Sequence, residues 1–228
     1  MPIEITHAIE PGTFASAPQP TLRTHDGELT LRSCELRDAP AVHEAFQDPA
    51  LRYWHARSME SLDEARAWVE EAHESWRREK AAQWFVTRTA DGAPLGRIAL
   101  RDMDLMEGGA EIGYWVLPQA RGRGVAPRAL AALTDWALDA GFHRLDLEHS
   151  TRNEASCRVA LKAGFPLEGT RRSSALHTDG WHDMHVHARI QDTPDPGHPG
   201  SNPGHPGSNP GHPGFRAPRR RDGGRVRR

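Results

Sequence analysis

The sequence predicts a single α/β (α+β) domain, and three observations lead to this fold class. Patterns typical of strands and helices alternate as β-α-α-β-β-β-α-β-α-β-β over residues 21–191. A glycine-rich loop joins one of these strands directly to a helix at residues 119–124. Residues 1–20 and 192–228 lack apolar periodicity, so we expect a flexible lead-in and a disordered tail.

The first half of the domain combines one strand with two helices. Glu28–Arg32 alternates weakly between apolar and polar residues and predicts a strand. Asp38 suits an N-cap and Pro40 suits a first turn, so a helix is expected to about residue 46. A second helix is expected from Ser61, where Glu64 completes a capping box. Its apolar residues have helical spacing: Ala65, Trp68, Val69, Ala72 and Trp76.

The second half contains mostly strands, separated by clusters of turn-forming residues. Pro127 fits the first turn of a helix that Gly141 ends, and Asn153 caps a shorter helix that ends at Gly164. The expected strands are Gln83–Arg88, Gly96–Asp102, Ala110–Leu117, Arg144–His149, Leu167–Leu176 and Trp181–Ile190. The last two form a hairpin that completes the domain.

The loop between the strand at Trp115 and the helix at Val125 has the composition of an anion site. Gly122 and Gly124 lack Cβ atoms, so backbone N–H groups can approach an anion closely. The helix N-terminus adds a partial positive charge. The loop is therefore predicted to hold a pyrophosphate, although its spacing fits neither the dinucleotide-binding nor the Walker pattern.

Three segments resemble motifs of the GNAT N-acetyltransferases. Gln119–Gly124 matches the Q/R-x-x-G-x-G/A acetyl-CoA loop, and Asn153–Phe165 resembles a helix of the ribosomal-protein alanine acetyltransferase (RimJ/RimL) branch. Glu111–Trp115 is similar to that branch's fourth strand. The resemblance implies a mixed, mostly antiparallel central sheet of six to seven strands flanked by four helices. It also implies transfer of the acetyl group of acetyl-CoA to a primary amine within a ternary complex.

The cofactor site expected from the resemblance joins this loop to the start of the shorter helix. Because Pro118 has no N–H and weakens strand pairing, the N–H of Leu117 is expected to be free to bind the thioester carbonyl. The expected cofactor-binding residues are Val116, Leu117, Gln119, Arg121, Gly122, Arg123, Gly124, Val125, Ala126, Asn153 and Ser156.

Two residues are candidates for moving protons. Glu111 is expected to act as the base that deprotonates the amine, through a water molecule; the alternative is a glutamate that only solvates a strand end. Many members of the family carry a tyrosine acid on the helix that Asn153 starts, and this chain has none there. Ser156 is the candidate acid instead, with a local hydrogen-bonding role as the alternative.

The acceptor is expected to be a protein N-terminus or a small-molecule amine. Candidate wall residues are Tyr53, Trp54, His55, Trp115 and Trp181, all of which are equally compatible with a core role. The competing function is a non-catalytic acyl-CoA-binding or interaction module. Its seven tail arginines, among residues 215–228, would dock RNA or an acidic partner weakly.

Composition limits the remaining possibilities. No apolar run approaches 20 residues and no secretory signal is visible, so we expect a cytoplasmic monomer or homodimer without membrane contact, whose cysteines, Cys34 and Cys157, are reduced. His185 and His187 share one face of the expected last strand, a spacing that metals can use. Acetyl transfer needs no metal, however, so no metal site is expected.

Overall fold

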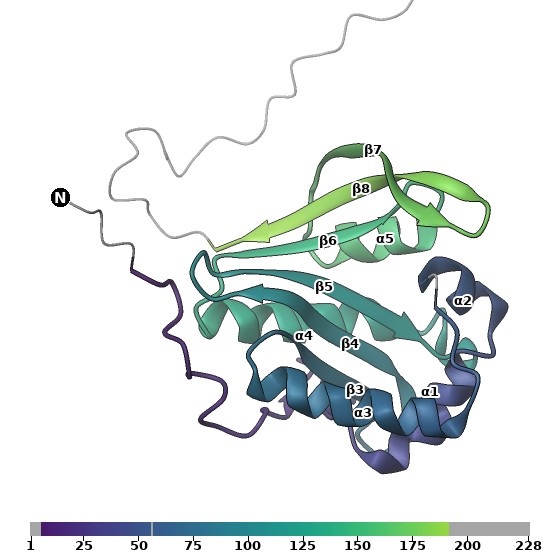
Figure 1. The fold of residues 1–228 in the computed structure, drawn as a ribbon, viewed down its shortest axis with the longest axis horizontal. Helices are drawn as coiled ribbons and strands as arrows, with labels where there is room; N and C mark the ends of the chain where they lie inside the picture. Colours follow the sequence, from purple (N-terminus) through teal and green to yellow (C-terminus); the bar gives the residue numbers. More distant parts are fainter. Residues whose placement is uncertain (1–5, 56, 192–228) are drawn as a thin grey trace, which may run out of the picture. The chain divides into compact units, whose positions relative to one another are not determined.

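The computed structural model describes residues 6–55 and 57–191. Its sheet has eight strands in the order β1-β2-β3-β4-β5-β6-β8-β7, and all neighbours are antiparallel except β5 and β6 (Figure 1). The strands are β1 Leu22–Arg23, β2 Leu29–Ser33, β3 Ala82–Arg88, β4 Pro94–Asp104, β5 Gly109–Val116, β6 Arg144–Ser150, β7 Leu167–His177 and β8 Gly180–Ile190. The α-helices are α1 Ala39–Ala45, α2 Pro49–His55, α3 Leu62–Arg77, α4 Val125–Asp139 and α5 Glu154–Lys162.

These elements confirm the predicted fold class and add one strand and one helix to it. The additional strand, β1, is only two residues long and pairs Leu22 with Leu31. The additional helix, α2, begins where Asp48-Pro49 was expected only to end a helix. The Asp48 carboxylate accepts a hydrogen bond from the Leu51 N–H at 3.3 Å, so the same residues that end α1 also cap α2.

The helices cover both faces of the sheet (Figure 1). On one face, α3 begins at the predicted cap, where the Ser61 hydroxyl accepts from the Glu64 N–H, and it buries all five predicted apolar residues. On the other face, α4 contributes Leu130 and Leu133, both fully buried. Among the described residues, no helix is long and apolar enough to cross a membrane.

The N-terminal segment is packed against the domain from Ala8 onward. The Ile9 N–H donates to the Leu105 carbonyl at 3.0 Å. Phe14 is 5% exposed and stacks on Phe142 with ring centroids 5.7 Å apart. The Glu79 carboxylate accepts hydrogen bonds from the backbone N–H groups of Gly12, Phe14 and Ala15. This differs from the flexible lead-in expected over residues 1–20, because a single aromatic anchor is invisible to periodicity arguments. The expected tail, 192–228, lies outside the described residues.

Candidate active site

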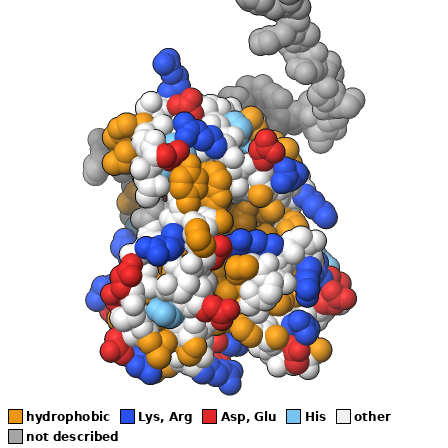
Figure 2. All heavy atoms as spheres, turned by 90° about the vertical axis from the view of Figure 1, so that its right-hand side faces the viewer, with side chains coloured by type: hydrophobic (Ala, Val, Ile, Leu, Met, Phe, Trp, Pro, Cys, Tyr) orange, Lys and Arg blue, Asp and Glu red, His pale blue; other side chains and the backbone are white. Residues whose placement is uncertain are grey.

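The strands β5 and β6 separate and leave an opening in the sheet. They pair only at Gly109–Glu111 with Arg144–Asp146, after which β5 continues along β4 and β6 continues along β8. A cleft of about 800 Å³ lies at this opening, within the usual size range of small-molecule sites. It reaches from α2 and β7 to the N-terminus of α4. Figure 2 shows a hollowed face with hydrophobic side chains gathered in it and basic side chains beside them.

The glycine loop forms one end of the cleft. Gly122 and Gly124 have φ values of 74° and 70°, which residues other than glycine tolerate poorly. α4 begins immediately afterwards, so the N–H groups of its first turn have no intrahelical acceptor. Arg128 fixes the loop by donating to the Gly124 carbonyl at 3.1 Å and to Asp26 and Glu28. The geometry is that of an anion-binding helix N-terminus.

The two loop arginines do not both face the cleft. Arg121 forms an ion pair with Asp48 and donates to the Val116 carbonyl at 3.2 Å, so it connects the loop to the start of α2. Arg123 is exposed and, like Gln119, does not line the cleft. Both Gln119 and Arg123 are exposed, and their expected contact with the cofactor stays a prediction.

The expected role of the Leu117 N–H is wrong. This N–H donates to the Leu95 carbonyl at 2.9 Å, because β4 continues to pair with the chain beyond Val116. Hydrogen bonds alternate along an antiparallel ladder, so the N–H groups of Val116 and Tyr114 must point to the opposite edge. That edge borders the opening between β5 and β6. The N–H that faces the opening is therefore that of Val116 and not that of Leu117.

Glu111 lies on the face of β5 that carries α1 and α3. Its carboxylate is paired with the Arg101 guanidinium, and its side chain is 26% exposed. Burial raises the pKa of Glu111, the charge of Arg101 lowers it, and nearby Glu148 raises it; the net direction is upward. A Cβ on Gly113 would approach the Arg101 Nε to 3.0 Å, so the glycine makes room for the arginine. The residue has the raised pKa that suits a general base.

Ser156 lies on the opposite face, in the first turn of α5. The Tyr114 hydroxyl and the Ser156 Oγ are 2.9 Å apart and form a hydrogen bond. Burial raises the pKa of Tyr114 to about 12, so the phenol keeps its proton. Asn153 caps α5 as predicted, because its Oδ1 accepts from the Ser156 N–H at 3.1 Å. Both Ser156 and Asn153 line the cleft.

The acceptor residues predicted from the sequence separate into two groups. Trp54, His55 and Trp115 line the cleft, and burial together with the charges of Arg97 and Arg101 lowers the pKa of His55 to about 4. Tyr53 faces a neighbouring depression, where its hydroxyl donates to Asp179 at 2.8 Å. Trp181 is 61% exposed and does not line the cleft, although its cross-strand partner Leu176 does.

Several cleft residues were missed by the sequence analysis. Tyr114 was given no role, although strand alternation places it on the face of β5 opposite to that of Glu111. Lys162 stands in the motif of the resemblance and lines the cleft. Arg97, Arg101 and His149 carried no signal, because only the sheet brings them to the opening.

A mixed sheet that opens beside an anion-binding helix N-terminus is the arrangement expected of an acyl-CoA-dependent transferase. The sequence matches the Acetyltransferase (GNAT) domain family over residues 28–166. The chain belongs to this family of acetyltransferases, which confirms the predicted family and enzyme class.

Relatives and solved structures agree with this assignment. The uncharacterized N-acetyltransferase YoaA of Bacillus subtilis is 27% identical over 72% of this chain and 93% of its own. The ribosomal-protein-serine acetyltransferase of Escherichia coli is 32% identical over 43% of this chain and 56% of its own. The microcin C7 self-immunity acetyltransferase MccE, solved in complex with acetyl-CoA and AMP, shares the fold with a TM-score of 0.65. It is 21% identical, and the match covers 72% of this chain and 93% of that one.

Proposed function

We propose that this protein transfers the acetyl group of acetyl-CoA to a primary amine, directly and within one ternary complex. The observation that carries the proposal is the placement of Glu111 and Ser156 on opposite faces of β5, at the same opening. A passage between two faces lets a thioester arrive from one side and an amine from the other. A module that only bound acyl-CoA would not need this arrangement.

The α4 N-terminus and the glycine loop hold the donor. Their N–H groups face the place where a pyrophosphate would lie, and Gly122 has open space where a Cβ would be. Asn153 and Ser156 border the same side of the cleft. Bound acetyl-CoA supplies an activated acetyl group as a thioester. The Val116 N–H, at the edge of β5, is the backbone donor for the oxygen on which charge develops.

The residues around the opening divide the proton transfers between the two faces. Glu111, with its raised pKa, removes a proton from the incoming ammonium so that a lone pair becomes available. As the C–N bond forms and the C–S bond breaks, Ser156 passes a proton to the departing thiolate and takes up the second N–H proton of the attacking nitrogen, so the hydroxyl is regenerated. The Tyr114 hydroxyl orients the Ser156 Oγ. Trp54 and His55 form the wall on the acceptor side.

The acceptor class follows from the cleft and from the relatives together. The Escherichia coli relative is named for a serine of a ribosomal protein, so a protein N-terminus is one candidate. A free small amine is the other, since the same ammonium chemistry applies. An amine panel containing N-terminal peptides, amino acids and polyamines, read by mass spectrometry of the products, distinguishes them.

The first prediction concerns Glu111→Gln. We expect kcat to fall by about 10²–10⁴-fold while acetyl-CoA affinity is retained, because the base is lost and the donor side is intact. In the wild type, kcat/KM should fall as the pH drops through the raised pKa of Glu111, since the protonated carboxyl cannot accept a proton. This limb should disappear in the variant.

Glu107→Gln is the matched control, because Glu107 is an exposed glutamate in the turn before β5. It should leave kcat unchanged. Wild-type kcat in Glu111→Gln at neutral pH would show that Glu111 only pairs with Arg101. Thiol release without any acetylated amine in the whole panel would contradict the proposed function.

A further inference from the structure

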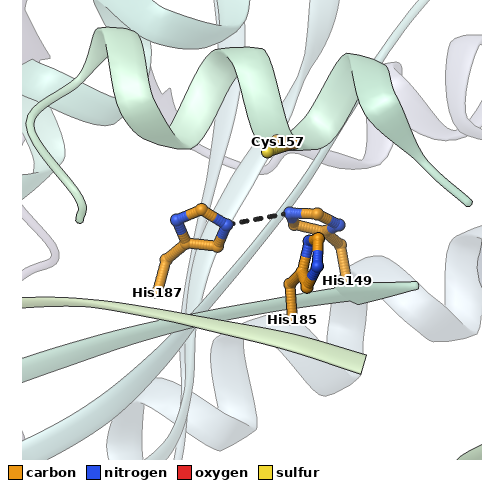
Figure 3. Close-up of side chains that lie close together, drawn as sticks. All are labelled: His149, Cys157, His185 and His187. Carbon is orange, nitrogen blue, oxygen red and sulfur yellow. Dashed lines mark hydrogen bonds between the residues drawn. The ribbon is translucent and has the colours of Figure 1, made fainter. Parts of the chain in front are cut away.

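Three histidines and a cysteine meet between α5 and the sheet (Figure 3). His149 comes from β6, His185 and His187 come from β8, and Cys157 comes from α5. The β6–β8 register places His149 directly opposite His185. One ligand atom from each of the four side chains lies within 4.8 Å of all the others. Segments far apart in the sequence thus bring four metal-binding side chains together.

Backbone carbonyls fix the orientation of two of these rings. The His149 Nδ1 lies 2.8 Å from the Ser150 carbonyl, and the His187 Nδ1 lies 3.0 Å from the Phe165 carbonyl. A carbonyl only accepts, so both Nδ1 atoms carry hydrogen. In neutral rings both Nε2 atoms then present lone pairs, yet they face each other at 3.2 Å. Two facing lone pairs repel unless a cation lies between them or one ring takes a second proton.

The third histidine has an unused polar atom. The His185 Nδ1 is buried and has no hydrogen-bond partner among the described residues. Its ring lies edge-on to His149, with centroids 5.3 Å apart. A buried nitrogen without a partner costs free energy, and coordination of a cation would satisfy it.

We propose that His149, His185, His187 and Cys157 bind one Zn²⁺ ion. Imidazole nitrogen and thiolate sulfur are the ligands that zinc prefers, in tetrahedral sets of four. With Zn–N bonds of about 2.0–2.1 Å, two tetrahedral nitrogen ligands lie roughly 3.3 Å apart, close to the observed Nε2–Nε2 separation. The carbonyls on the two Nδ1–H groups are the outer contacts that zinc-bound histidines usually make.

The position of the site indicates its consequence. Cys157 follows Ser156 on α5, and His149 borders the cleft. An ion held there would tie α5 to β6 and β8 and so fix the wall that carries Ser156. Acetyl transfer itself needs no metal, so the ion would have a structural role and take no part in the transfer. No metal site was expected from the sequence, because acetyl transfer needs none. His149 and Cys157 are also distant from the β8 histidines along the chain.

Zinc binding by the whole 228-residue chain tests the proposal. The tail contains His198, His205 and His212, so the variant with all three changed to Asn serves as the background. After dialysis against Zn²⁺, we expect one retained ion per chain. On this background, Cys157→Ser and His185→Ala should each weaken zinc binding by at least about tenfold. His25→Ala, an exposed histidine paired with Asp135, is the matched control and should bind normally.

Co²⁺ provides a second measurement on the unaltered cluster. Tetrahedral coordination by a thiolate gives intense visible bands and a sulfur-to-cobalt charge-transfer band, and the latter should be absent in Cys157→Ser. The spectrum of the unaltered protein shows whether a thiolate binds the metal, even where circular dichroism shows that a variant is unfolded. The proposal is overturned if the background protein retains no zinc. It is also overturned if both cluster variants fold and bind zinc with unchanged affinity. In either case, a proton shared between His149 and His187 would explain their close approach.

Discussion

At the residue scale, the cleft depends on pairs of side chains that are joined across strands. Gly113 leaves space for Arg101, which in turn holds Glu111 at the opening. On the other face of β5, Tyr114 holds Ser156. Strand alternation separates the two pairs, because neighbouring residues of a strand point to opposite faces. A single strand therefore positions both candidate proton-transfer groups.

Ser156→Ala tests the proton donor. Removal of the hydroxyl should lower kcat by about 10²-fold, the low end for acid catalysis, because a thiolate is a weakly basic leaving group. Tyr114→Phe keeps the ring but removes the bond to Ser156, worth about 1 kcal/mol, so kcat should fall about fivefold. Steady-state kinetics with a fixed amine measures both. Equal kcat in Ser156→Ala and the wild type would assign Ser156 a local structural role.

At the scale of elements, the opening exists because β5 and β6 are parallel neighbours that pair over only three residues. β4 holds one strand and β8 holds the other, so the two diverge without unfolding. The N-terminus of α4 lies at the end of this opening. Unpaired strand edges and helix N–H groups are thus gathered where a long, polar ligand can use them.

Gly124→Glu tests the role of the α4 N-terminus. A carboxylate at this place should repel a pyrophosphate and obstruct the loop, and acetyl-CoA binding should weaken by about 1.5–3 kcal/mol, as measured by calorimetry. Gly92→Glu is a matched control: Gly92 has φ +71° and open space around it, but it lies in the β3–β4 turn. Equal acetyl-CoA affinity in the two variants would show that the N-terminus of α4 does not bind the pyrophosphate.

At the scale of the whole molecule, the N-terminal segment completes the core. Phe14 packs among Trp76, Trp136 and Phe142, and so covers the junction between α3 and α4. Phe14→Ala should lower the free energy of unfolding by about 3–5 kcal/mol, measured by urea denaturation. Ser16→Ala, at an exposed position two residues on, should change it little. A small effect of Phe14→Ala on the free energy of unfolding would favour the flexible lead-in that the sequence predicted.

Removal of residues 192–228 tests the proposed domain boundary. Among the described residues, those that line the cleft all precede Gln191, and the last strand ends at Ile190. A chain that ends at Gln191 should therefore keep its melting temperature and its kcat on a small amine. Loss of activity on every small amine would show that residues 192–228 are needed for catalysis and that the domain boundary is wrong. If the tail arginines bind an anionic partner, added salt should weaken that binding.

Local patterns in the sequence determined much of this fold. The Ser61 cap, the helical spacing in α3 and the glycines before α4 were predicted, because they depend on neighbouring residues. The loop and the two expected proton-transfer residues followed from short motifs. The extra helix α2 was missed because Asp48 serves both as the end of one helix and as the cap of the next.

Tertiary structure alone decided the remaining features, because they depend on which strands become neighbours. The register of β4 with β5 engages the Leu117 N–H and directs that of Val116 to the opening. The β6–β8 pairing brings His149 to His185, and α5 adds Cys157. Hydrogen-bond direction and cross-strand distance are set by the whole sheet, and no local stretch of sequence contains them.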